Sequence, residues 1–257
     1  MKIATFNING IKARLPRLLD WLDGSGADIV CLQELKSQPE NFPADRLEAA
    51  GWHVEIVGQK SFNGVGILSR KPPGRTRLRA LPGDPDDEQA RYIEAEFDDL
   101  VVASIYLPNG NPAPGPKYDY KLAFMARLID HAATLFASER PVILAGDFNV
   151  IPTPADCHDP KAWEKDALFL PETRARFRTL LFQGWTDAIR HRHKSADCFT
   201  FWDYQAGAWQ KDNGIRIDHL LLSPAAADRL DDAGIDRMER GREKASDHVP
   251  VWIALRD

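Results

Sequence analysis

The chain has 257 residues, of which 44% are hydrophobic and 28% are charged. This length allows one large α/β domain with a real core or two small ones, and we expect one domain spanning 1–257. No apolar run approaches the roughly 20 residues of a membrane-spanning helix, and the N-terminus lacks a secretory signal pattern. The net charge of −5 argues against a global basic field for nucleic acid, although local basic rims are not excluded.

The three cysteines, Cys31, Cys157 and Cys198, are odd in number and far apart. Because no CxxC pair occurs, a zinc site is not expected. Cys31 lies in an apolar run, where a cysteine behaves as a small core residue. These facts fit a reducing cytoplasm.

The spacing of apolar residues predicts the elements in chain order. Residues 2–7 predict a strand, and leucines at helical spacing then predict a helix that ends at Gly24-Ser25-Gly26. Further strands are predicted at 28–34, 64–68, 92–97, 100–106, 142–146, 199–204, 215–222 and 249–255. Further helices are predicted at 122–136 and 174–181, and loops at 70–90, 108–116 and 151–171, the last with short helical pieces.

Strands outnumber helices, and they come singly or in hairpin-like pairs such as 92–97 and 100–106. This order favours an α/β sandwich over a doubly wound parallel sheet, which would need regular βαβ alternation. Neither of the glycine-rich phosphate loops GxxxxGK[ST] and GxGxxG occurs. An enzyme acting on nucleoside triphosphates is therefore disfavoured.

Acid and amide residues stand where predicted strands end. A carboxylate there is held by a rigid scaffold and still faces solvent, so several such groups suggest one site at the rim of a β core. Their types suit a hard divalent metal and the hydrolysis of a phosphate. The groups are Asn7 and Asn9, Gln33-Glu34, Asp147-Phe148-Asn149, Asp218-His219 and Ser246-Asp247-His248.

Phosphodiester cleavage would give these residues distinct tasks. Glu34 and the amide oxygen of Asn7 would supply a modest, open magnesium site, and Asp147 is a candidate base for water. His248 could pair in space with Asp218, which would fix the imidazole tautomer. Asn149 and Tyr106 offer hydrogen-bond donors to the charged phosphate oxygens.

Each of these residues also has an ordinary structural interpretation. Glu34 could be a solvated strand end, Asp147-Phe148-Asn149 a simple turn, and His248 a satisfied interface histidine. Asp218 is harder to explain in this way, because it interrupts an apolar strand and a buried carboxylate is costly unless paired. His219 lies on the opposite strand face and is expected to be structural.

The aromatic stretch 199–204 is either core packing or a wall for a base or sugar. Lys211, Asn213 and Arg216 nearby could contact backbone phosphate. Three basic patches stand out, and a solvated surface is the ordinary interpretation of each. They are Arg75, Arg77 and Arg79; Arg190-His191-Arg192-His193-Lys194; and Arg237, Arg240, Arg242 and Lys244.

A set of phrases in this order resembles the exonuclease III family of apurinic/apyrimidinic endonucleases. They run from residue 5 to residue 252 and so span nearly the whole chain. The resemblance implies a four-layered α/β sandwich like that of DNase I, with two packed, mostly antiparallel β-sheets flanked by helices and the site at one edge. The phrases are FNINGIKAR, LQELK, GVGILSR, YLPNG, GDFNVIPTPAD, FTFWDY, NGIRIDHLLLS and SDHVPVW.

The resemblance also implies roles. Mg²⁺, or Mn²⁺ in its place, would be held chiefly by Glu34, and Asp147 would deprotonate the attacking water or protonate the leaving group. The implied metal-binding set is Asn7, Glu34, Asp147, Asn149, Asp247 and His248. The implied catalytic set is Tyr106, Asp147, Asn149, Asp218 and His248. The implied substrate-binding set is Asn9, Asn109, Lys121, Phe199, Phe201, Trp202, Lys211 and Asn213, with the aromatic residues around a flipped-out abasic sugar.

Two departures from the family pattern are visible. Asn9 stands where some members carry Asp, so a second metal ligand there is in doubt. The proline-rich loop 111–116 lacks the Arg that some members insert into DNA, so the balance between exonuclease and abasic-site cleavage could differ. No long N-terminal extension like that of some eukaryotic members is present, which fits a bacterial-type, cytoplasmic, nucleoid-associated enzyme.

The expected function is magnesium-dependent repair of duplex DNA, with cleavage 5′ to an abasic site and trimming of 3′ ends. The protein is expected to act as a monomer and without a membrane. One alternative is another phosphodiesterase of the same superfamily, acting on a lipid or inositol phosphate. A second alternative is a catalytically weak relative that binds nucleic acid and regulates. No central acid is lost, which disfavours this last alternative.

Overall fold

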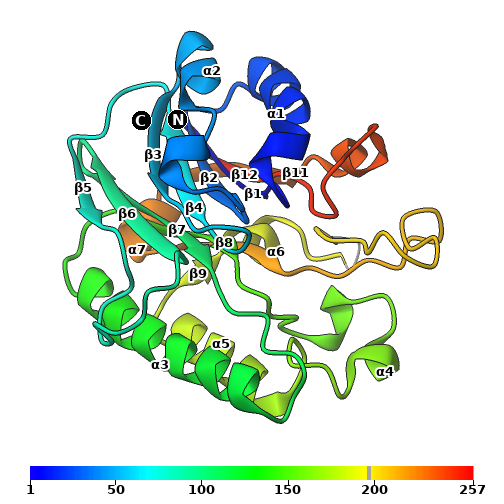
Figure 1. Ribbon diagram of the computed structural model, residues 1–257. Coiled ribbons are helices and arrows are strands. Elements are labelled where there is room, and N and C mark those ends of the chain that lie inside the picture. The colour runs from blue at the N-terminus through cyan, green and yellow to red at the C-terminus, as the bar shows by residue number, and fades with distance from the viewer. Residues whose placement is uncertain (196–197, 257) are drawn as a thin grey trace.

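Two six-stranded β-sheets pack face to face, and helices cover their outer faces (Figure 1). The computed structural model describes residues 1–195 and 198–256. The two packed sheets and the helices on their outer faces confirm the expected four-layered sandwich. Each sheet contains one parallel strand pair, and its other pairs are antiparallel.

The first sheet has the order β11-β12-β1-β2-β4-β3 and the second the order β5-β6-β7-β8-β10-β9. The first comprises β11 (Leu230–Ile235), β12 (Val251–Leu255), β1 (Lys2–Asn7), β2 (Ile29–Gln33), β4 (Val65–Ser69) and β3 (His53–Val57). The second comprises β5 (Arg75–Leu78), β6 (Tyr92–Phe97), β7 (Leu100–Tyr106), β8 (Val142–Asp147), β10 (Asp218–Leu222) and β9 (Thr186–Asp187).

Helices lie on both outer faces of the sandwich, and short helical turns lie in the connections (Figure 1). On the first sheet lie α1 (Ile11–Ser25) and α2 (Ala44–Ala49), and on the second α3 (Pro116–Phe136) and α5 (Pro171–Phe182). The short elements are η1 (Pro39–Asn41), η2 (Pro154–Asp156), α4 (Pro160–Trp163), α6 (Ala188–Arg192), α7 (Pro224–Ala227) and η3 (Arg237–Gly241). Within the described part of the chain, no helix has the length and apolar character to cross a bilayer.

The alternation of side chains along the strands builds three layers of core. Ile3 of β1 joins the cluster between the two sheets, whereas Ala4 and Phe6 pack with residues of α1. The central strand β8 is buried along its whole length, because one face meets the first sheet and the other meets α3 and α5. A strand covered on both faces has a continuous apolar sequence, which is why this segment was predictable.

The structure corrects several expected elements. The expected loop 70–90 contains the edge strand β5. Its arginines form ion pairs with glutamates and do not pack into a hydrophobic core. The expected strand 199–204 is not a strand, since it forms only isolated bridges from Phe201 to Ile215 and His248. Its aromatic alternation instead serves a small cluster in which Phe199 and Trp202 pack together.

Gly146 lets the parallel strands β7 and β8 approach each other just before Asp147. Its φ is 157°, and a Cβ built there would lie 1.9 Å from the carbonyl oxygen of Ile105. We expect Gly146→Ala to lower the free energy of unfolding by at least about 3 kcal/mol, because strain and a backbone clash combine. Urea unfolding checks this.

Gly24→Ala is the matched control, because Gly24 lies in α1 and nothing is within 4 Å of the added Cβ. It should change the free energy of unfolding little or raise it slightly. Equal stability of the two variants would contradict the role given to Gly146.

Candidate active site

The site forms where strands of both sheets end at one edge of the sandwich. β1 and β2 run parallel in the first sheet, as do β7 and β8 in the second, so each pair ends at a common edge. Tyr106, Asp147 and Asp218 are direct neighbours in register across β7, β8 and β10. Asn7 ends β1, and Glu34 follows β2.

Asn7 joins the acids of the two sheets. Its Nδ2 donates to Glu34 Oε1 at 3.2 Å and to Asp147 Oδ2 at 2.9 Å. The side chain is completely buried, so these bonds are shielded from water. One amide therefore fixes the separation of two carboxylates that lie in different sheets.

Glu34 presents its carboxylate toward solvent from a left-handed backbone with φ 52°. It accepts a hydrogen bond from the Tyr106 hydroxyl at 2.7 Å and pairs with Lys36 at 2.8 Å. Burial raises the pKa of Glu34, but the Lys36 ammonium and the Tyr106 hydroxyl outweigh it, so the pKa falls below its ordinary value of 4.5. Glu34 is therefore ionised at neutral pH.

Tyr106 is held in its protonated form. Burial and the carboxylates of Glu34 and Asp147 raise the pKa of its hydroxyl well above 10. The Arg91 guanidinium stacks 4.8 Å from the ring centroid and donates to the Tyr106 carbonyl oxygen. The phenol is thus a fixed hydrogen-bond donor at the site.

Asp218 and His248 form a buried pair. The imidazole Nδ1 lies 2.9 and 3.1 Å from the two Asp218 oxygens, and the Thr200 hydroxyl donates to Asp218 Oδ2 at 2.6 Å. Burial lowers the pKa of His248, but the carboxylates of Asp218 and Asp147 outweigh it and raise the pKa to about 10. His248 Nε2 lies 3.8 Å from Asp147 Oδ2.

Asp147 lies at the centre of the cluster. It accepts hydrogen bonds from the Asn149 backbone amide at 2.9 Å and from Asn149 Nδ2 at 3.2 Å. Burial raises the pKa of Asp147, and the carboxylates of Asp218 and Glu34 raise it further. They outweigh the His248 imidazole, which lowers it, and the pKa reaches about 7. A carboxyl group with a pKa near neutrality is suited to accepting and returning a proton.

Lys121 anchors the loop beside Asp147 from within. It is fully buried, and its ammonium donates to the carbonyl oxygens of Pro108, Asn109 and Asn149 at 2.6 to 3.1 Å. Burial lowers the pKa of Lys121 to about 7. The exposed Asn109 donates to Asn149 Oδ1 at 3.2 Å. Lys121 therefore positions this loop rather than presenting its charge at the surface.

Oxygen ligands for a cation gather around Lys36. The Lys36 ammonium lies 2.8 Å from Glu34 Oε2 and 2.5 Å from Asn9 Oδ1, and Asn9 Nδ2 donates to Asp247 at 2.9 Å. The two oxygens that hold the ammonium, one from a carboxylate and one from an amide, are of the types that a hard cation binds. Ligand atoms of Asp147, Asp218 and His248 also lie within 4.8 Å of one another and could hold a metal.

The aromatic residues expected to bind substrate take different positions. Phe201 is half-buried, and its ring centroid lies 4.9 Å from that of His248, so it lines the site. Trp202 is fully buried and Phe199 nearly so, in the cluster beneath. Lys211 is exposed and Asn213 half-buried in the turn that precedes Ile215.

The expectation that Arg216 contacts phosphate is wrong. Arg216 is buried and pairs with Asp156 at 2.7 Å and with Asp187 at 2.8 Å. It also donates to Nδ1 of His219, whose Nε2 bonds the Val150 carbonyl oxygen, so His219 is structural as expected. The network fixes the strand that carries Asp218.

Two residues of the site were not found from the sequence. Thr200 holds Asp218, and its signal was its place in the phrase FTFWDY. Lys36 holds Glu34, and its signal was the phrase LQELK. The prediction used the acid of LQELK and the aromatic residues of FTFWDY, and it passed over Lys36 and Thr200.

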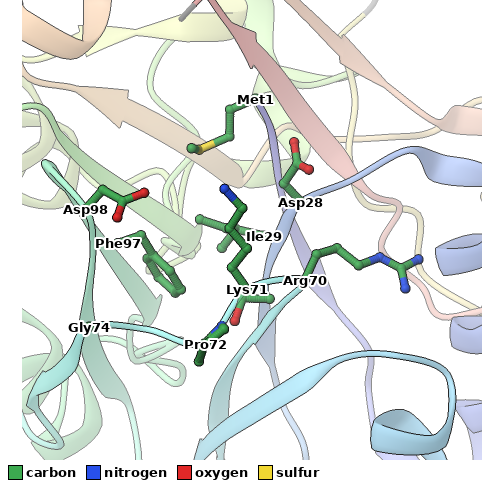
Figure 2. A pocket seen from close by; sticks show the side chains of 10 residues that line it. Met1, Asp28, Ile29, Arg70, Lys71, Pro72, Gly74, Phe97 and Asp98 are labelled. Atoms are coloured by element: carbon green, nitrogen blue, oxygen red, sulfur yellow. The ribbon is translucent and has the colours of Figure 1, made fainter.

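A cavity of about 440 Å³ lies at the opposite edge of the sandwich, where β1 and β2 begin (Figure 2). Lys71 and the carboxylates of Asp28 and Asp98 line it together with Met1 and Phe97. The lining carries both signs of charge, and the length of β1 and β2 separates it from Asn7 and Glu34. It is therefore no part of the candidate active site.

Comparison with known proteins agrees with this geometry. Residues 4–248 match the Endonuclease/Exonuclease/phosphatase family, and the chain belongs to that family. Exodeoxyribonuclease III of Haemophilus influenzae is 36% identical to it, with both chains covered completely. Two solved structures are similar over at least 99% of each chain. They are an AP endonuclease from Archaeoglobus fulgidus, with 34% identity and a TM-score of 0.95, and the 3′-5′ exonuclease NExo from Neisseria meningitidis, with 38% identity and a TM-score of 0.96.

Within the family, the chain is a nuclease of the exodeoxyribonuclease III and AP endonuclease group. The resemblance inferred from the motifs is thereby confirmed, as is the expectation of a hydrolase. The roles of individual residues are inferred from the geometry.

The buried His248 predicts a pH dependence of stability. Its pKa in the folded chain is about 10 against 6.5 ordinarily, so the stabilisation is complete below pH 6.5 and is lost as the pH rises toward 10. Between pH 7 and pH 9 His248 therefore lowers the free energy of unfolding as the pH rises. Lys121, whose pKa is lowered from 10.5 to about 7, opposes it over the same window. The raised pKa of Asp147 acts mainly below this window.

In His248→Gln the free energy of unfolding, measured with urea in chelator, should rise with pH between 7 and 9 more steeply than in the wild type. A neutral amide cannot titrate, so the contribution of Lys121 is left unopposed. An unchanged slope in His248→Gln would show that another group is responsible. The imidazole titration followed by NMR gives the same pKa independently.

Proposed function

We propose that the chain is a magnesium-dependent DNA-repair phosphodiesterase that cuts the backbone 5′ to abasic sites and trims 3′ ends. The observation that carries this proposal is the continuous hydrogen-bonded set Glu34–Asn7–Asp147 beside His248–Asp218 at one sheet edge. A structure similar to this chain, with 38% identity and a TM-score of 0.96, is the 3′ phosphatase NExo bound to a product DNA hairpin. This neighbour supports a nucleic-acid substrate.

We assign the metal to Glu34 and Asn7, with Asp247 and Asn9 beside them. Their oxygens suit Mg²⁺ or Mn²⁺, and Glu34 is ionised and half-buried. The bound ion would neutralise charge on the phosphate and on the leaving oxygen. The Asp147, Asp218 and His248 group is less suited, because magnesium favours oxygen ligands and retains waters, whereas this group is buried and includes an imidazole.

The protein groups divide the remaining work. Asp147 accepts a proton from the attacking water at a carboxylate oxygen, and Asn149 keeps that oxygen in place through Nδ2. His248, oriented by Asp218, directs Nε2 toward a phosphate oxygen, and the Tyr106 hydroxyl donates from the other side. Because the pKa of Asp147 lies near 7, protonation of the leaving oxygen by a protonated Asp147 is the alternative role for this carboxyl group.

The substrate contacts follow from the exposed rim. Phe201, packed on His248, would be the apolar wall for a flipped-out sugar, with Phe199 and Trp202 supporting it from beneath. Asn109, Lys211 and Asn213 lie in exposed or half-buried loop positions that can reach backbone phosphate. We further propose a monomeric single domain, acting on duplex DNA in a reducing cytoplasm in keeping with its three free cysteines.

The substrate is tested with a duplex that carries one synthetic abasic analogue. We expect a nick on its 5′ side with Mg²⁺ and none with chelator, and slower release of nucleotides from the 3′ ends of an undamaged blunt duplex. Absence of nicking with Mg²⁺ or Mn²⁺ would instead favour a nucleic-acid-binding regulatory protein. A parallel assay on an inositol phosphate should give no product.

Glu34→Ala and Asp218→Ala should each lower kcat about a hundredfold or more, because they remove the chief metal ligand and the orienter of His248. Glu48→Gln, an exposed acid on α2, is the control and should leave kcat unchanged. Circular dichroism confirms that each variant is folded. A wild-type rate in either variant would remove that residue from the site.

A further inference from the structure

A basic pocket lies beside the candidate active site, between α1 and the segment that follows β11. Its volume is about 390 Å³, and Tyr204 forms part of its wall. In Figure 1 the two segments are neighbours, blue and red. The cations that line it are Arg14, Arg240, Arg242 and Lys244.

Two of these guanidinium groups are held in place by neutral partners. Arg14 donates to the carbonyl oxygen of Asn9 at 2.6 Å and to the Tyr204 hydroxyl at 3.0 Å. Arg240 donates to the carbonyl oxygens of Trp202 and Asp203 at 3.1 and 3.3 Å and stacks 4.9 Å from the centroid of the Tyr204 ring. The contacts fix the geometry of both groups without cancelling their charge.

The charge of the pocket is largely uncompensated. Within residues 1–195 and 198–256, no carboxylate forms an ion pair with Arg14, Arg240 or Lys244, and Arg242 lies 3.7 Å from Glu239. The other acids on this segment are Asp236, Glu243 and Asp247. Asp236 accepts from the indoles of Trp21 and Trp252, and Asp247 accepts from Asn9. The buried Nε of Arg14 also has no hydrogen-bond partner. Ordered cations without acids form a preorganised anion site.

Asn9 connects the pocket to the candidate active site. Its carbonyl oxygen accepts from Arg14, while its Nδ2 donates to Asp247 at 2.9 Å and lies 3.5 Å from the Tyr204 hydroxyl. A phosphate in the pocket would therefore lie only a few side chains away from a phosphate that is cleaved beside Glu34. Phosphates repeat about every 3.4 Å of axis along a DNA strand, so a bound strand presents further anions within that reach.

We propose that this pocket binds one backbone phosphate of the DNA strand, a short distance along the duplex from the scissile phosphate. Planar guanidinium groups match the oxygens of a phosphodiester. The inference rests on the proposed function, because it takes DNA as the bound anion. It explains why a chain of net charge −5 keeps cations unpaired at this position.

Arg14→Gln/Arg240→Gln tests the pocket. With the abasic duplex at about 0.15 M salt, KM should rise about tenfold, and the slope of log affinity against log salt should fall by about 1. Arg242→Gln/Lys244→Gln, which changes two side chains with no hydrogen bond to the backbone among the described residues, should shift both quantities in the same direction. It keeps the test valid if the first variant folds poorly.

Arg46→Gln/Arg178→Gln is the matched control. Both arginines are exposed, on α2 and α5, and neither lines the pocket. It removes the same charge, so a general loss of attraction to DNA would appear there too. The proposal is overturned if the control raises KM and lowers the salt slope as much as the pocket variants do.

A duplex series with one neutral methylphosphonate at each position locates the contact. Wild-type protein should lose affinity at one phosphate near the abasic analogue, and Arg14→Gln/Arg240→Gln should lose nothing further at that phosphate. Equal losses for the two proteins at every position would reject the assignment. Binding is measured in chelator by fluorescence anisotropy, so it tests the pocket separately from cleavage, whose absence would count against the proposed function alone.

Discussion

The Asn7 amide is the interaction on which the candidate site depends. It bonds to a carboxylate of each sheet at once, at 3.2 Å and 2.9 Å. Two acids held close without a donor between them would repel each other, and burial would then favour the neutral form. Lys36 and Tyr106 then outweigh burial and keep Glu34 ionised, whereas burial and the Asp218 carboxylate raise the pKa of Asp147 to about 7. Asn7 thus holds together two acids whose protonation differs because their other neighbours differ.

The sequence predicted most of the central strands because their faces are covered on both sides and their residues are continuously apolar. Edge strands such as β5 (Arg75–Leu78) and β11 (Leu230–Ile235) were missed, because charge and solvent exposure remove that pattern. The aromatic stretch 199–204 was misjudged because local alternation is also produced by a cluster of rings folded around Trp202. Local patterns identify a strand only where a neighbour is available to pair with it.

The gathering of the candidate residues was predictable, since they stand where strands end and those strand ends meet at one edge of the sandwich. Their partners were not. Arg216 was expected at the surface, but its two carboxylates come from positions 60 and 29 residues away, and no local signal reports such pairing. Lys121 was expected to meet substrate and is instead buried against three carbonyl oxygens. Whether a cation faces solvent or the interior is decided by tertiary contacts.

The position of β12 has a consequence for synthesis of the protein. This strand lies far from β1 in sequence, yet it pairs with β1 inside the first sheet, and His248 lies shortly before it. During translation, a nascent polypeptide therefore lacks both the imidazole and the partner strand of β1 until this segment has left the ribosome. The hydrolytic site cannot assemble before that segment has been synthesised, because the Asp218–His248 pair and the β1–β12 ladder both need it.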